Sequence, residues 1–83
     1  MAHSLLMSTE SALKASIEAG VPSAIVEVTS SSAGHYSLTV KAEVFRGRSM
    51  LECHRMVYAA IAPLMSGDAA PVHAIDQLKT VAG

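Results

Sequence analysis

The chain contains few of the residues that usually stabilise or activate a small protein. Among its 83 residues there are one cysteine, one phenylalanine, two tyrosines and no tryptophan. A single cysteine excludes an intrachain disulfide framework, so we expect a reducing, cytoplasmic location. Because aromatic side chains are scarce, the core must be built mainly from aliphatic residues, which supply most of the 51% hydrophobic content.

Long apolar runs and the motifs of common enzymes are also absent from the sequence. No run approaches the roughly 20 apolar residues that a membrane-spanning helix needs. Residues 1–7 lack the basic region and the apolar length of a signal peptide. There is no CxxC, HExxH, P-loop or GxSxG motif, and no pair of carboxylates is spaced for acid–base catalysis. We therefore predict a protein that is not an enzyme and has no membrane segment.

Charge is nearly balanced but unevenly distributed along the chain. The net charge of −1 argues against a dedicated nucleic-acid binder, because such proteins usually carry a basic excess. Most of the basic residues nevertheless fall within residues 41–55, opposed there only by Glu43 and Glu52. They are Lys41, Arg46, Arg48 and Arg55. This segment, which also contains Gly47, is a candidate contact for phosphates or for an acidic protein surface.

The first half of the chain predicts a helix followed by a β-hairpin. The helix covers residues 8–19, with Ser8 as N-cap and with Gly20 and Pro22 ending it. A strand over residues 24–29, a flexible loop over 30–34 and a second strand over 35–44 follow. Alternate residues of the second strand are apolar and should share one face. These residues are Tyr36, Leu38, Val40 and Ala42.

The second half predicts a long helix and one more strand. Ser49 is the expected N-cap of a helix over residues 50–65, with Pro63 distorting the last turn. The expected apolar stripe consists of Met50, Val57, Ile61 and Leu64. A short strand follows over residues 72–79, and we expect frayed ends over 1–7 and 80–83. A right-handed crossover would place the last strand parallel to the second. The prediction is thus one α+β domain with a three-stranded mixed sheet and both helices on one face.

Five segments of the chain, in this order and with compatible gaps, resemble the BolA family. They are Val21–Val28, Gly34–Tyr36, Phe45–Gly47, Cys53–Tyr58 and Val72–Ile75. The resemblance covers residues 10–79. It implies a class II KH-like α-β-β-α-β fold, in agreement with the order of elements that the hydrophobic pattern predicts.

The resemblance also implies a partner and a cofactor. BolA-like proteins are known as partners of monothiol glutaredoxins, with which they form heterodimers that share a [2Fe–2S] cluster in cluster trafficking and iron signalling. The BolA side supplies the histidine that begins the last strand and a histidine or cysteine of the hairpin loop. Carried over, the first ligand is His73. Ser32 occupies the usual region of the loop ligand, so His35 is the nearest substitute. Isolated, the chain would be a monomer without cofactor.

Two other functions stay open from the sequence. Some BolA proteins are described as DNA-binding regulators of transcription, a role in which residues 41–55 would contact phosphates. The turn has only Gly47 where KH loops read Gly-x-x-Gly, which weakens RNA binding in particular. The other function is a protein-interaction module without a cofactor. We interpret His54 as a neutral structural histidine, because the helix dipole disfavours a protonated imidazole early in a helix. We interpret Cys53 as a partly buried bystander, because His54 lies about 100° away around the helix and cannot act as its base.

Overall fold

The computed structural model describes residues 8–83, so the expected disorder of residues 1–7 lies outside the described residues. The elements are α1 (Thr9–Gly20), β1 (Ile25–Ser32), β2 (His35–Ala42), a 3₁₀ helix η2 (Glu43–Phe45), α2 (Met50–Met65) and β3 (Ala74–Ala82). The predicted α-β-β-α-β order is confirmed, with one short 3₁₀ turn added between β2 and α2. No helix among residues 8–83 is long and apolar enough to cross a membrane.

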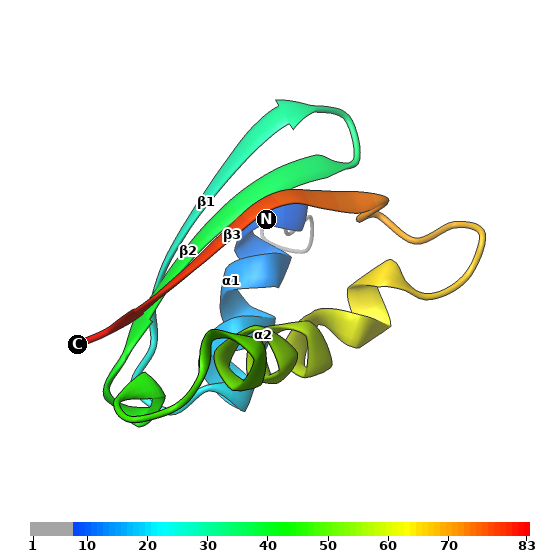
Figure 1. Cartoon of the computed structure of the whole chain (residues 1–83). Coiled ribbons are helices and arrows are strands. Elements are labelled where there is room, and N and C mark those ends of the chain that lie inside the picture. Colours follow the sequence, from blue (N-terminus) through cyan, green and yellow to red (C-terminus); the bar gives the residue numbers. More distant parts are fainter. Residues whose placement is uncertain (1–7) are drawn as a thin grey trace, which may run out of the picture.

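The sheet has the strand order β1-β2-β3. Strand β1 pairs antiparallel with β2, and β3 pairs parallel with β2, as predicted for a right-handed crossover. Figure 1 shows both helices on the same side of this sheet. It also shows that the tip of the β1–β2 hairpin and the start of β3 lie at the same end of the molecule.

The core lies between the sheet and the two helices. The predicted alternation along β2 is confirmed, since its four alternate apolar residues are all buried. They pack in one cluster with Leu13 and Ile17 of α1 and with Val57 and Ile61 of α2. Burying an aliphatic side chain of this size contributes about 1.5–3 kcal/mol relative to leaving it exposed. The sheet is therefore held on the helices by a small, mainly aliphatic core.

Both predicted N-caps are present in the structure. The Ser8 hydroxyl accepts a hydrogen bond of 3.0 Å from the backbone N–H of Ser11. At α2, the Ser49 hydroxyl accepts from the Glu52 N–H at 3.1 Å, and the Glu52 carboxylate accepts from the Ser49 N–H at 2.9 Å. This reciprocal capping box fixes the first turn of α2. The backbone hydrogen bond from Ser49 is the main cause that lowers the pKa of Glu52.

The structure corrects the expected side-chain stripe of α2. Met50 was expected in the core, but its side chain is 72% exposed. Cys53, one turn later, is buried instead, with its sulfur 3.8 Å from the Phe45 carbonyl oxygen. The 3₁₀ turn explains this shift, because it buries Phe45 beside the first turn of α2 and so selects which side of the helix faces inward.

The structure also corrects several strand boundaries. Strand β3 begins at Ala74 rather than at residue 72, so His73 lies just before it. Strand β1 continues through Ser32, so the expected loop over 30–34 shrinks to a turn at residues 33–34. Strand β2 ends at Ala42, before the 3₁₀ turn. The tail expected to fray is paired: Ala82 lies opposite Ala42, and the Gly83 N–H donates to the Ala42 carbonyl at 3.2 Å. Parallel pairing with β2 therefore extends β3 to the end of the sheet.

Candidate functional site

Gly34 holds the hairpin tip against the start of β3. Its φ of +79° is a conformation that glycine adopts without steric penalty. Its carbonyl oxygen accepts hydrogen bonds from the N–H groups of His73 at 2.8 Å and Ala74 at 3.1 Å. A Cβ added to Gly34 would lie 2.9 Å from Cγ of His73, so the imidazole packs directly on the glycine backbone. The structure thus places His73 beside the tip, where it is exposed.

His35 begins β2 at the same tip. It immediately follows Gly34 and lies opposite Ala74, the residue after His73, in the parallel pairing. Its Nδ1 lies 3.0 Å from Oδ1 of Asp76, and the two side chains are 43% and 39% exposed. The structure therefore brings both histidines that the sequence indicates, His73 and His35, to one end of the sheet.

A third side chain completes a hydrogen-bonded chain at this end. The Ser31 hydroxyl donates to Oδ2 of Asp76 at 2.8 Å, while Oδ1 faces His35. The hydrogen bond with His35, followed by the one from Ser31, lowers the pKa of Asp76. The ionised carboxylate can only accept hydrogen bonds, so a neutral His35 must carry its proton on Nδ1. Its Nε2 has no hydrogen-bond partner among the described residues.

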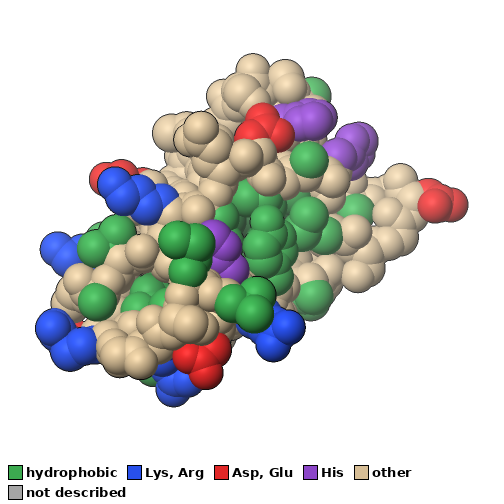
Figure 2. Space-filling view, in the orientation of Figure 1, with side chains coloured by type: hydrophobic (Ala, Val, Ile, Leu, Met, Phe, Trp, Pro, Cys, Tyr) green, Lys and Arg blue, Asp and Glu red, His purple; other side chains and the backbone are tan. Residues whose placement is uncertain are grey.

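The donor atoms at the tip are the imidazole nitrogens of His73 and His35. Within residues 8–83, no group of three or more His, Cys, Asp or Glu side chains is arranged to hold a metal ion. These two imidazoles could supply two nitrogen ligands to a metal, and its other ligands would have to come from a second molecule. Figure 2 shows histidine side chains and a carboxylate near one end of the molecule, away from most Lys and Arg side chains.

Three other candidate residues contribute less to this site. Ser32 is exposed at the end of β1, opposite His35 in the pairing, and a hydroxyl is a poor cluster ligand. Cys53 was predicted to be partly buried, but its side chain is only 4% exposed and belongs to the core. His54 is half-buried on α2.

The basic segment lies at the far end of the sheet from the histidines. Lys41, Arg46, Gly47, Arg48 and Arg55 are all exposed. The eight-residue β2 separates this end from His35 by about 25 Å, at roughly 3.3 Å per residue. The structure thus divides the candidate residues between two regions rather than one.

Part of the basic charge is already engaged within the chain. The Arg46 guanidinium lies 3.4 Å from the Glu43 carboxylate, and the Arg48 Nε donates to the Val44 carbonyl at 2.9 Å. Arg48 and Arg55 also lower the pKa of Glu52, after the larger effect of its hydrogen bonds with Ser49. Arg46 and Arg48 therefore each make a contact within the segment itself, while the charge of the segment stays as the sequence gives it.

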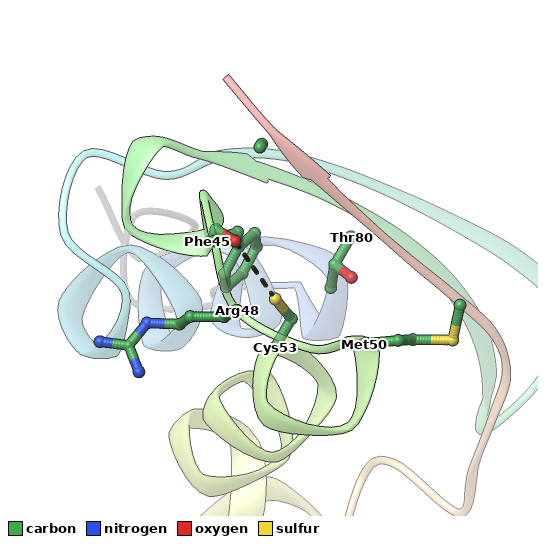
Figure 3. Close-up of a pocket in the computed structure, with 7 residues that line it drawn as sticks. Phe45, Arg48, Met50, Cys53 and Thr80 are labelled. Atoms are coloured by element: carbon green, nitrogen blue, oxygen red, sulfur yellow. Dashed lines mark hydrogen bonds between the residues drawn. The ribbon is translucent and has the colours of Figure 1, made fainter.

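An open pocket of about 320 Å³ lies beside this basic turn. It is lined by Phe45, Gly47, Arg48, Met50, Cys53, Thr80 and Ala82. Figure 3 shows the Cys53 sulfur directed at the Phe45 carbonyl, while the Arg48 guanidinium extends away from it. The buried thiol is thus held by the backbone, and its one hydrogen-bond partner among residues 8–83 is a carbonyl oxygen, which cannot act as a base.

The fold and the site define a small α+β domain with two accessible imidazoles at a hairpin tip. A family model described as BolA-like protein matches residues 2–82. The chain therefore belongs to the BolA-like family. Comparison with curated protein sequences gave no match.

Solved structures of BolA-like proteins share this fold. The solution structure of yeast Fra2 is 26% identical, with a TM-score of 0.66 over 88% of this chain and 77% of that chain. The solution structure of mouse BolA1 is 28% identical, with a TM-score of 0.64 over 86% of this chain and 63% of that chain. A BolA-like protein of Rickettsia prowazekii is 25% identical, with a TM-score of 0.65 over 90% and 94% of the two chains.

Sequence reasoning missed two residues of the site, Ser31 and Asp76. Ser31 lies in the segment predicted as a flexible loop and Asp76 in the predicted last strand, and neither was named as a candidate site residue. Asp76 follows His73 by three residues, and this spacing does not indicate a contact with His35 on another strand. The pairing of the three strands brings these side chains together, and the sequence pattern does not show that pairing residue by residue.

Proposed function

We propose that the chain is a non-enzymatic adaptor that binds a monothiol glutaredoxin and shares a [2Fe–2S] cluster with it. It would act in iron–sulfur cluster trafficking and in iron and redox regulation. Membership of the BolA-like family supports this class of partner. The observation that carries the proposal is the exposed His73 imidazole, packed on Gly34 at the hairpin tip beside His35.

The two imidazoles would serve as this chain's share of the ligands, His73 first and His35 second. The cysteine of the glutaredoxin and the thiol of glutathione would supply the others. The cluster is cargo that needs both proteins, so we expect the isolated chain to be a monomer without cofactor. Histidine ligation in place of cysteine raises the reduction potential of such a cluster.

The test is a titration of this chain into cluster-loaded monothiol glutaredoxin with glutathione, followed by visible absorption and circular dichroism. We expect a spectral change with the wild type, its loss in His73→Ala and its alteration in His35→Ala. His54→Ala is the matched control, because it removes an imidazole from α2 rather than from the tip. An unchanged spectrum with binding still seen by calorimetry would favour an interaction module without cofactor.

One observation favours a second function, DNA binding, at the opposite end of the sheet. All the basic residues in 41–55 are exposed, and Arg46 and Arg48 lie in the turn just before α2, where backbone N–H groups favour anions. The pairing of Arg46 with Glu43 and the net charge of −1 weigh against tight binding. We therefore rank DNA-dependent regulation below the adaptor function.

A further inference from the structure

Two β-bulges lie on either side of the start of β2, one on each neighbouring strand. On β1, Ser31 is the extra residue between the pairs Ser30↔Tyr36 and Ser32↔His35. On β3, Asp76 is the extra residue, because Tyr36 pairs with Ile75 and the next residue of β2 pairs with Gln77. Bulges of this kind redirect a side chain relative to regular pairing, and they occur often near functional sites.

The two bulged residues meet at His35. Ser31 and Asp76 belong to the two edge strands of the sheet, and their 2.8 Å hydrogen bond joins these strands across β2. Asp76 therefore has a separate donor for each oxygen, Ser31 on Oδ2 and His35 on Oδ1. Two donors from two strands restrict the carboxylate more than a single surface ion pair would.

Stability alone does not account for this arrangement. The His35 and Asp76 side chains are 43% and 39% exposed, and pairs so accessible to water contribute little to the free energy of unfolding. The contact instead determines which ring nitrogen of His35 carries the proton. In a neutral imidazole free in water the Nε2–H form predominates, whereas an acceptor fixed at Nδ1 selects the Nδ1–H form.

We propose that Asp76 is a positioning residue, which holds His35 as the Nδ1–H tautomer and so leaves Nε2 available as the second nitrogen ligand, with Ser31 fixing the carboxylate. This inference rests on the proposed function. Histidines that bind metals commonly donate their other N–H to a carboxylate, and loss of that carboxylate weakens binding by about 10- to 100-fold. His73 has no such carboxylate contact among the described residues, so the two histidines would be oriented by different means.

The first experiment measures the imidazole tautomers by ¹⁵N NMR on the isolated chain, on the alkaline plateau of a pH titration. We expect His35 in the Nδ1–H form in the wild type and mainly in the Nε2–H form in Asp76→Ala, with an intermediate result in Ser31→Ala. His73 serves as an internal reference whose tautomer should not change. Asp68→Ala is the matched control, because it removes the same charge from the exposed α2–β3 loop. A wild-type His35 in the Nε2–H form overturns the inference.

The second experiment measures retention of the cluster in the complex with glutaredoxin. We expect Asp76→Ala to weaken retention about 10-fold or more, and Asp68→Ala to retain wild-type behaviour. If the tautomer changes while retention stays as in the wild type, the positioning role is overturned and the adaptor function stands. If the wild type itself gives no cluster spectrum, the adaptor function fails, and the role of Asp76 toward a cluster fails with it.

Discussion

Replacing Gly34 with alanine should separate the position of His73 from the stability of the fold. Gly34 has a φ of +79°, and a Cβ there would lie 2.9 Å from Cγ and 3.0 Å from Nδ1 of His73. A left-handed conformation costs a non-glycine residue about 1–2 kcal/mol. His73 is exposed, so its ring can move away without opening the core. The variant should therefore fold, with His73 displaced from the tip.

Gly67→Ala is the matched control for this perturbation. Gly67 has a φ of +89°, and no atom lies within 4 Å of the position of an added Cβ. Both variants should lose about 1–2 kcal/mol of unfolding free energy in urea titrations. Only Gly34→Ala should change the NMR shifts of the His73 ring and abolish the cluster spectrum with glutaredoxin. A full cluster spectrum in Gly34→Ala would refute the requirement for His73 at this position.

Three further predictions concern the core, the capping box and the basic segment. Ile61→Ala should lower the unfolding free energy by about 2–5 kcal/mol in urea, because Ile61 is fully buried; a loss below 1 kcal/mol would contradict this packing. The lowered pKa of Glu52 contributes stability that is fully present above its ordinary value of 4.5 and is lost as the pH falls through the lower folded value. The melting temperature of Glu52→Gln should therefore depend less on pH below 4.5 than that of the wild type. A plot of the logarithm of the DNA-binding constant against the logarithm of the salt concentration should have a slope of about −3.6 or shallower, because four cations contribute roughly −0.9 each. Fluorescence anisotropy titrations measure this slope, and a steeper value would mean that DNA contacts another surface.

Local signals made much of the fold predictable. Ser49 as N-cap was enough to predict the start of α2, and the structure adds the reciprocal contact with Glu52. The alternation from Tyr36 to Ala42 likewise defines one buried face of β2 without knowledge of its neighbours. The crossover rule then predicts the parallel direction of β3.

The remaining features depend on contacts between distant segments. Met50 and Cys53 are both apolar residues early in α2, and only the packing of Phe45 decides that Cys53 is the buried one. Residues 80–82 were expected to fray as a chain end, but each of them pairs with a residue of β2.

The candidate site, like the fold, was predictable only in part from the sequence. His73, which lies just before β3, was identified from family resemblance, and its exposure was expected. The contacts of Asp76 with His35 and with Ser31 were not expected, because Asp76 and Ser31 are each the extra residue at a register shift, one on β3 and one on β1. Register in a sheet is set by pairing over its whole length, so a single strand does not reveal it.

The proposal that His73 and His35 ligate the shared cluster can be tested by detecting their nitrogen atoms at the iron. This chain would be labelled with ¹⁵N-histidine and combined with unlabelled glutaredoxin and glutathione, and the reduced [2Fe–2S] complex would be examined by pulsed electron paramagnetic resonance. We expect ¹⁵N couplings from two histidines, of which one disappears in His73→Ala and the other in His35→Ala. A reduced cluster without any ¹⁵N coupling to the labelled chain would contradict the proposal.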